Sequence, residues 1–453
     1  MRFFRVSIMY CSISCSDQFD THLAEKIGKE QKFVVRGSLM DVKRLQLWED
    51  RHATMLSNET IRTVIEDHGG MILELSNVND EGGRVNAHPL YWFHGKGPSL
   101  ASEVNRDFYK ESNLLYHLGG NFFCFPNFGP DHAVQNVNHE AHGWTANGIW
   151  NVIKYGTDSE TGANWLLSTM VGPDAGYPFE AYKIDMLLPG HPVLYSSVSV
   201  KNTGKVALPA NAAWHNTTGS PFLESGCIIN LSADSFSTIP KNSEFDQTGR
   251  LAFGKEFDDL SKVPLRKEGT CDLSVVPGMI GYTDFITGKV PDSARLGWSS
   301  VINPRQKMVY FSFFPGPTAV EPNEVPLRFN NLWMQYGGRP FTPWALYEGG
   351  TDHTFCLGVE NAVGYYANGL GQSIAEKELL GAPTTVLLAP GETKVQRYGT
   401  AFTNYENGKI SAGIQSVEQV VEGLVLKRGK AWAFIECDST FHFLKQMEGK
   451  VFN

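Results

Sequence analysis

Residues 60–70, TIRTVIEDHGG, and residues 71–83, MILELSNVNDEGG, contain the pattern that decides the fold. Thr63 and Ile65 alternate with their neighbours before a break, and Ile72 and Glu74 alternate after it. Such alternation is typical of strands with one buried face, and the residues at 67–70 are suited to a tight turn between two of them. This stretch therefore predicts a β-hairpin.

The same alternation recurs along the chain, in VLYSSVSVKNTG at 193–204, in KMVYFSFFPGP at 307–317 and in TTVLLAPGETKVQRYGTAF at 384–402. Pro390 and Gly391 mark a reversal inside the last stretch. Because 45 Gly and 23 Pro interrupt the chain at short intervals, the pattern favours many short strands. Repeated meanders of this kind predict an all-β sandwich or barrel.

Helical spacing is confined to the edges of the sequence. It is found at 42–50, at 100–112 and in IQSVEQVVEGLVLKRG at 414–429, where Val417, Val420, Val421 and Leu424 recur at helical intervals. We expect three parts: an N-terminal extension at 1–55, a β-sandwich domain at 56–410, and a C-terminal helix and tail at 411–453 that packs on the domain.

Composition limits the partners and the compartment. The 453 residues carry a formal net charge of -9, which argues against nucleic acid as a partner because phosphate contacts need clustered Lys and Arg. The seven Cys have no metal-binding spacing, and their odd number favours reduced thiols. Arg5 interrupts the apolar start MRFFRVSIMYCSISC, and no apolar run approaches 20 residues. We therefore expect a cytoplasmic protein with no membrane contact.

Three segments combine His, carboxylates and aromatic residues beside Gly or Pro, as loops and strand ends around a concave site do. They are NFGPDHAVQNVNHEAHGWTANG at 127–148, LPANAAWHNTTGSPFLESG at 208–226, and GRPFTPWALYEGGTDHTFCLGVENAVGYY at 338–366. In the first segment, HEAH is one residue shorter than the zinc motif HExxH, and Gly143 and Gly148 argue against the helix that this motif needs. The sequence therefore disfavours a metal site.

Two residues in the other segments are candidates for acid–base chemistry. His215 lies between Trp214 and Asn216, and it is suited either to core packing or to proton transfer. Glu360 lies in an apolar run, where a carboxylate is costly unless it is paired or has a raised pKa. A structural ion pair with Arg339 is the alternative for Glu360.

Taken together, these segments resemble the galactose mutarotase (aldose 1-epimerase) superfamily, in particular its less characterised bacterial branch. His142 and Gly143 resemble the family's His-Gly element, WHNTTGSPFLESG resembles the strand with the catalytic His, and LGVENA resembles the late strand with the catalytic Glu. NTG at 202–204 and APGE at 389–392 are similar to turns of the family, the second to a closing hairpin. The resemblance covers roughly residues 58–405.

The resemblance implies a β-supersandwich with a few peripheral helices, whose concave face binds a pyranose. It implies Glu360 as the base on the O1 hydroxyl and His215 as the acid on the ring oxygen, with no cofactor. His142, Arg84, His88, Asp174, Glu348 and Trp144 are the expected substrate-binding residues. Trp214 and Trp344 are further candidates for a stacking face, although a Trp in a sandwich is more often core.

The sequence departs from the family at two places. The Asn-Arg element of the family's first strand is not clearly present, although Arg84 and Asn86 lie nearby, and Glu360 is followed by Asn361 and Ala362 instead of Pro. The substrate sugar is therefore left open, as is the choice between a monomer and a homodimer.

Two other functions are compatible with the same fold. One is a non-catalytic sugar-binding module, since a fold does not fix a function. The other is a glycoside hydrolase or lyase, which needs two carboxyl groups around the scissile bond, so that Glu348 or Asp352 would have to face Glu360. No cluster of Arg or Lys adjoins the expected site, which disfavours a sugar phosphate as substrate.

Overall fold

The computed structural model describes residues 41–47, 51–78, 114, 118–173, 176–278, 282–336, 355–405 and 410–452. The chain divides into two units, Met1–Ser38 and Leu39–Asn453, and every described residue belongs to the second. Among these residues, no helix is long and apolar enough to cross a membrane.

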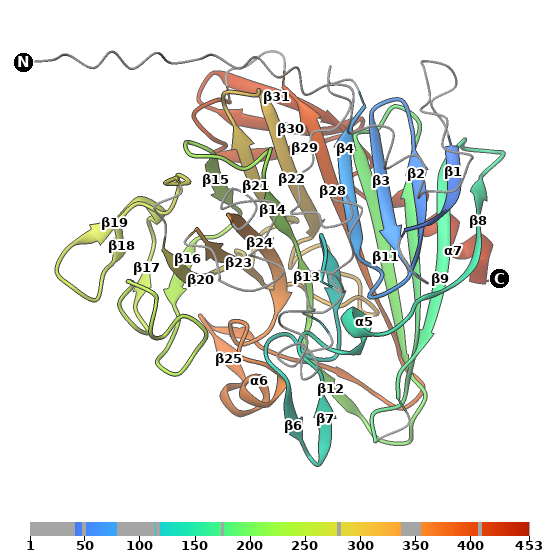
Figure 1. The fold of residues 1–453 in the computed structure, drawn as a ribbon, viewed down its shortest axis with the longest axis horizontal. Coiled ribbons are helices and arrows are strands. Elements are labelled where there is room, and N and C mark those ends of the chain that lie inside the picture. The colour runs from blue at the N-terminus through green and yellow to red at the C-terminus, as the bar shows by residue number, and fades with distance from the viewer. Residues whose placement is uncertain are drawn as a thin grey trace, which may run out of the picture. The chain divides into compact units, whose positions relative to one another are not determined.

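Two large antiparallel sheets form the body of the molecule (Figure 1). Sheet I contains, in spatial order, β15 (Ile228–Leu231), β21 (Leu296–Asn303), β22 (Met308–Pro315), β28 (Thr393–Asn404), β11 (Val193–Asn202), β10 (Phe179–Leu187), β9 (Asn164–Val171) and β8 (Asn151–Thr157). Sheet II contains β17 (Glu256–Phe257), β16 (Ser235–Thr238), β20 (Thr283–Lys289), β23 (Phe329–Gln335), β24 (Cys356–Val363), β13 (Ala212–His215) and β5 (Phe122–Cys124), and β14 (Thr217–Gly219) also pairs with β24. The all-β prediction is confirmed.

Smaller elements surround these sheets. An N-terminal sheet contains β1 (Asp41–Gln46), β2 (His52–Ser57), β3 (Ile61–Glu66) and β4 (Ile72–Asn77). Two-stranded pairs are β6 (His132–Val134) with β7 (Val137–His139), β12 (Leu208–Ala210) with β27 (Val386–Leu388), β18 (Val263–Pro264) with β19 (Thr270–Cys271), and β25 (Glu378–Leu379) with β26 (Ala382–Pro383). The described helices are α5 (Trp144–Asn147), the 3-10 turn η2 (Leu260–Lys262), α6 (Leu370–Glu376) and α7 (His442–Phe452). A last sheet contains β29 (Ser416–Val420), β30 (Gly423–Arg428) and β31 (Ala431–Glu436).

The hairpin predicted from residues 60–83 is confirmed, because β3 pairs with β4 around a turn at 67–70. The reversal at Pro390 and Gly391 is also present, but it is not a hairpin. β27 pairs with β12, whereas β28 pairs with β11 and β22 in sheet I. The turn therefore connects two sheets, since alternation marks a strand without showing which partner it has.

Two helix predictions were wrong. Residues 42–46 lie in strand β1, and 48–50 are outside the described residues. Residues 414–429 contain the β29–β30 hairpin, and the C-terminal helix is α7. In the second case the chain reverses at 421–422, where the helical spacing would continue, and Val420 pairs with Gly423. Gly423 has a φ of 159°, and a Cβ at this position would lie 2.1 Å from the Ile435 carbonyl oxygen. Helix spacing in a short β-branched run is weak evidence when a turn interrupts it. The predicted helix at 100–112 lies outside the described residues.

The expected boundary between extension and domain at residue 55 falls within β2, which pairs with β1 on one side and with β3 on the other. Strands β1 and β2 are thus part of the N-terminal sheet. Lys183 of β10 fixes the end of this sheet to sheet I, because its buried amine donates to the Gly70 carbonyl at 3.2 Å and pairs with Asp185 at 2.5 Å.

A buried polar network joins sheet II to sheet I. Asn361 of β24 donates to Ser299 at 2.6 Å and to Asn330 at 2.7 Å. Asn121 donates to Asn216 at 3.0 Å and to Tyr310 at 3.1 Å. Tyr398 links the two halves, because its hydroxyl donates to Asn361 and accepts from Asn216. The side chains that make these bonds are almost completely buried, so the network fixes the two sheets against each other.

The C-terminal helix α7 is attached to sheet I by Arg397 of β28. The Arg397 guanidinium donates to both carboxylate oxygens of Glu448, at 3.0 and 3.2 Å from Nε, and pairs with Glu324 on its other side. Ser197 of β11 also donates to Glu448, at 2.5 Å. Arg397 is only 5% exposed, so this charge depends on its partners.

Candidate active site

The register of sheet II places a row of side chains across five strands on the face opposite the polar network. Phe122 is opposite His215, Asn331 is opposite Glu360, and Thr287 is opposite Asn331. Trp214 is opposite Asn361, and the next residues of that antiparallel pair are His215 and Glu360. Residues 145 positions apart in the sequence therefore lie side by side.

His215 and Glu360 are in direct contact, with His215 Nε2 3.2 Å from Glu360 Oε1. The imidazole of His215 is stacked on Phe122, with ring centroids 4.6 Å apart and planes 11° apart. Its other nitrogen, Nδ1, is 3.2 Å from the Thr217 hydroxyl. The stack and the two polar contacts fix the orientation of the ring, which is 8% exposed.

Glu360 is 1% exposed, and its second oxygen, Oε2, has no hydrogen-bond partner among the described residues. Burial raises the pKa of Glu360 to about 8, the charge of Glu244 adds to this, and the amide of Asn331 opposes it. The alternative of an ion pair with Arg339 concerns a residue outside the described parts of the chain. Among the described residues no cation pairs with Glu360, so a charged carboxylate is costly at this buried position.

His142 joins the pair from the loop before α5. Its ring meets that of His215 edge to face, with centroids 4.9 Å apart, and its Nδ1 is 3.7 Å from the Cys124 sulfur. Desolvation and the neighbouring His215 lower the pKa of His142 well below its usual range. Burial and the charge of Glu360 raise the pKa of Cys124, so this thiol stays protonated.

The local backbone explains why Gly follows His142. Gly143 has a φ of 81°, and a Cβ at this position would lie 2.3 Å from the Phe125 carbonyl oxygen. Only Gly allows the chain to pass this close to β5 and to turn into α5. The His-Gly pair of the sequence is thus the feature that brings the His142 ring to His215.

The site holds one titratable proton between His215 and Glu360 at neutral pH. Burial lowers the pKa of His215 to about 4, while that of Glu360 is about 8. At pH 7 the imidazole is therefore neutral and the carboxyl is mostly protonated, with His215 Nε2 and Glu360 Oε1 3.2 Å apart. An acid and a base in contact inside a dry site can protonate one atom of a substrate while they deprotonate another.

Gly358 leaves room for this pair on strand β24. A Cβ at residue 358 would lie 2.9 Å from the Trp333 Cβ and 3.3 Å from Glu360 Oε1. Trp333 itself is 6.2 Å from the His215 ring between centroids, on the side away from Phe122 in the row. Because Gly358 has no side chain, the Glu360 carboxyl has room beside Trp333.

The structure brings together three of the residues expected at the site, His142, His215 and Glu360. Trp144 lies beside them in the sequence but packs in an aromatic cluster with His139, Tyr177 and Phe179. Trp214 is turned to the other face of sheet II, where it stacks on Tyr398. The other candidates lie outside the described residues; these are Arg84, His88, Asp174, Glu348, Trp344 and Asp352.

Sequence reasoning missed five residues of the site: Phe122, Cys124, Thr217, Asn331 and Trp333. A signal existed only for Thr217, which is two residues from His215 and therefore follows it on the same side of an extended chain. The others come from strands β5 and β23, and their proximity depends on the pairing of distant strands. Their sequences, NFFC and NNLWMQ, read as ordinary buried strands.

The histidines of the first segment form no metal site in the described residues, where no group of three His, Cys, Asp or Glu could hold an ion. His132 and His139 are paired across the β6–β7 hairpin. His132 accepts from the Gly371 amide at 2.8 Å, which fixes this hairpin to α6. Burial lowers the pKa of His139 to about 4, so it is neutral within the aromatic cluster.

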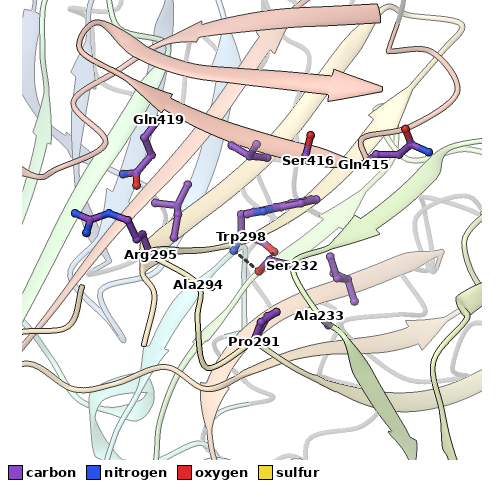
Figure 2. Close-up of a pocket in the computed structure, with 12 residues that line it drawn as sticks. Ser232, Ala233, Pro291, Ala294, Arg295, Trp298, Gln415, Ser416 and Gln419 are labelled. Atoms are coloured by element: carbon purple, nitrogen blue, oxygen red, sulfur yellow. Dashed lines mark hydrogen bonds between the residues drawn. The ribbon is translucent and has the colours of Figure 1, made fainter. Parts of the chain in front are cut away.

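A separate cavity of about 550 Å³ lies between sheet I and β29 (Figure 2). Ser232 and Trp298 line it, and the Trp298 amide donates to the Ser232 hydroxyl at 2.7 Å. Gln415 and Gln419 of the C-terminal segment line the opposite side, and Arg295 is the charged residue of the lining. The lining contains no acid–base pair, and for this reason the row around His215 is the candidate active site.

Comparison with solved structures supports the fold and does not establish the chemistry. A galactose mutarotase-like protein from Clostridium acetobutylicum is 13% identical, covers 81% of this chain and 99% of its own, and superimposes with a TM-score of 0.54. A putative aldose 1-epimerase from Klebsiella pneumoniae is 12% identical, covers 82% of this chain and 85% of its own, and also has a TM-score of 0.54. No protein-family model and no curated protein sequence matches the chain. The chain has the galactose mutarotase-like fold.

Proposed function

We propose that this protein is an aldose 1-epimerase-like isomerase, which interconverts the anomers of a neutral sugar with His215 as acid and Glu360 as base. The observation that carries the proposal is the 3.2 Å contact between these two buried groups. The mutarotase-like fold and the similarity to a putative aldose 1-epimerase add support. Enclosure of opposite proton carriers in one site is the arrangement that general acid–base catalysis requires.

The chemistry needs one proton donor and one proton acceptor side by side, because O1 and the ring oxygen are bonded to the same carbon. The proton shared by the pair first passes from Glu360 to His215. Glu360 then takes the proton of the O1 hydroxyl while His215 protonates the ring oxygen, the bond between C1 and the ring oxygen breaks, and an aldehyde forms. Rotation about the next carbon–carbon bond and closure on the other face give the second anomer. The pair then holds one proton again, so the cycle consumes nothing.

The substrate contacts proposed beyond this pair are those of a pyranose. His142 is available to hydrogen-bond a sugar hydroxyl, and Phe122 and Trp333 border the pair with aromatic surface. Arg84, His88, Asp174, Glu348 and Trp144 remain proposed substrate-binding residues. We also infer a cytoplasmic location, since the five Cys among the described residues are all free thiols.

The test is the optical rotation of freshly dissolved α-anomers of several neutral aldoses. We expect wild type to accelerate mutarotation, and His215→Ala and Glu360→Gln each to reduce the rate by about a hundredfold or more. His191→Ala is the matched control, because His191 also has a pKa lowered by burial but bonds Tyr195 at 2.7 Å, away from the row. Absence of acceleration with every aldose would contradict the proposal.

The pH dependence gives a second readout. The pair is active when it holds one proton. Above about pH 8 it loses this proton as Glu360 ionises, and below about pH 4 it gains a second proton as His215 becomes charged. We therefore expect a bell-shaped rate profile with limbs near these values, measured on wild type between pH 3.5 and 9.5. The limbs belong to the coupled pair and not to one residue alone.

A glycoside hydrolase or lyase is the second candidate, and one observation favours it. The charge of Glu244 acts on Glu360, so a second carboxylate is near the first. Two carboxylates around a scissile bond are the arrangement of glycosidases. Release of reducing ends from a glycoside that Glu244→Gln abolishes, with no effect on mutarotation, would support it. A sugar that raises the melting temperature without any turnover would instead indicate a binding module.

A further inference from the structure

We infer that Asn331 is the positioning residue of the acid–base pair: its side-chain amide, oriented by Thr287, holds the Glu360 carboxyl toward His215. This role rests on the proposed function, in which Asn331 had no part. The three residues occupy β20, β23 and β24, three neighbouring strands of sheet II.

The register supports this assignment. Thr287 is opposite Asn331, and Asn331 is opposite Glu360, so the three side chains emerge in line on one face. Side chains directly opposite each other in an antiparallel pair have Cβ atoms about 5 Å apart. An Asn amide and a Glu carboxyl are each long enough to meet across that separation.

The hydrogen bonds give the amide its direction. The Thr287 hydroxyl donates to Asn331 Oδ1 at 2.9 Å, which leaves Nδ2 for the other side, where β24 lies. Asn331 Nδ2 and Glu360 Oε2 are both buried, and neither has a hydrogen-bond partner among the described residues. A donor and an acceptor without partners on adjacent strands are complementary, and each is costly to leave unpaired.

The same row explains what the amide does for the chemistry. Glu360 Oε1 contacts His215, so an amide at Oε2 prevents the carboxyl from turning away. An N–H that faces a carboxylate favours its charged form. The state with Glu360 charged and His215 protonated, which the proposed reaction uses, is therefore easier to reach.

Other groups around Glu360 do not supply this interaction. Cys124 of β5 is a protonated thiol, and His142 contacts His215 and Cys124. Glu244 carries a charge of the same sign and disfavours ionisation of Glu360. Among the described residues that face Glu360, Asn331 is thus the neutral donor that opposes the effect of burial.

The experiment compares wild type with Asn331→Leu, which keeps the size of the side chain and removes the donor. We expect the rate of mutarotation to fall at least tenfold and the alkaline limb of the pH profile to move up by about one unit, because the carboxylate loses a hydrogen-bond donor. Ser237→Ala is the matched control: Ser237 is opposite Thr287 in the same row but bonds Tyr366. It should leave the limb unchanged.

A direct titration separates this inference from the proposed function. The carboxyl absorption of Glu360, assigned by its loss in Glu360→Gln, can be followed by infrared difference spectroscopy without any substrate. An upward shift in folded Asn331→Leu supports the positioning role even if wild type proves inactive on every aldose. An unchanged Glu360 titration overturns it even if the enzyme is active.

Thr287→Val provides the second variant, in case Asn331→Leu does not fold. It retains Asn331 but removes the hydroxyl that orients the amide, so a smaller upward shift of the Glu360 titration is expected. No shift with Thr287→Val, together with an unfolded Asn331→Leu, would mean that Asn331 is structural only, and this result also overturns the inference.

Discussion

The two faces of the central strands of sheet II differ in how their polar groups are satisfied. Three pairs of consecutive residues send one side chain to each face: His215 and Asn216, Asn331 and Asn330, and Glu360 and Asn361. On the inner face, the three Asn residues bond one another, Ser299 and Tyr398 in a neutral network. On the other face, Glu360 Oε2 and Asn331 Nδ2 have no partner among the described residues. We call these the network face and the row face.

The difference shows how a sheet can keep an energetically costly buried carboxyl at the position where the chemistry needs it. A buried network in which every amide is bonded is rigid and specific, whereas a buried carboxyl without a cation is costly. Because the two kinds of residue alternate along the same strands, the network directly supports the backbone from which His215 and Glu360 project. The row face is thus held in place by the network face.

The largest effect is expected from Asn361→Leu on the network face. The substitution removes one hydrogen-bond partner each from Ser299, Asn330 and Tyr398 inside the protein, which should lower the free energy of unfolding by about 3 to 5 kcal/mol. Chemical denaturation at pH 7 measures it. Tyr398→Phe, which removes one hydroxyl, is the graded control and should cost about 1 to 2 kcal/mol. Equal losses would show that the network is not cooperative.

Glu360→Gln should have the opposite sign on the row face, and the effect should depend on pH. Native Glu360 has a pKa of about 8, against 4.5 for the exposed group, so the native state holds its proton more tightly between these values. Stability of wild type therefore falls as the pH rises through this window. Relative to wild type, the variant should gain roughly 2 to 4 kcal/mol more at pH 9 than at pH 5.

The same pH scan on Asn361→Leu sharpens the contrast. A neutral amide does not titrate, so the loss caused by this variant should be the same at pH 5 and pH 9. A pH-dependent loss would mean that the network face and the row face are coupled through the charge of Glu360. The measurement in both cases is the melting temperature and the denaturant midpoint across the pH range.

A smaller effect is expected from Gly358→Ala, which adds one methyl group to the row face. The new Cβ would lie 2.9 Å from the Trp333 Cβ, so the strand has to shift, at a cost of about 1 to 3 kcal/mol. Mutarotation should fall as well, since Glu360 moves. Gly156→Ala on edge strand β8 is the control, because nothing lies within 4 Å of its Cβ position. Similar stability of the two variants would contradict the packing described for Glu360.

Much of the fold could be predicted from the sequence, because alternation of apolar and polar residues reports directly on strands with one buried face. The hairpin at 60–83 is an example. The helix prediction for residues 414–429 was wrong because the Val residues there recur at a helical interval by coincidence within a β-hairpin. In a short run, the spacing of apolar residues does not distinguish a helix from a β-hairpin. The residue that indicated a turn was Gly423.

The candidate site could be predicted only in part. His215 and Glu360 stood out as candidates for acid–base chemistry, and the resemblance to a known family gave their roles and added His142. Asn331 and Phe122 could not be found, because their role depends on register. Register is set by contacts between strands that are far apart in the sequence. Asn361 is instructive, since it first stood out as a departure from the family and the structure gives it five partners in the network.

The attachment of α7 has a consequence for synthesis of the protein. Glu448 leaves the ribosome 51 residues after Arg397. The strands of sheet I are therefore all synthesised before the Arg397 guanidinium can pair with Glu448. A buried charge is costly until it is paired. The surface of sheet I around Arg397 is therefore expected to stay open in the nascent chain until residue 448 has emerged.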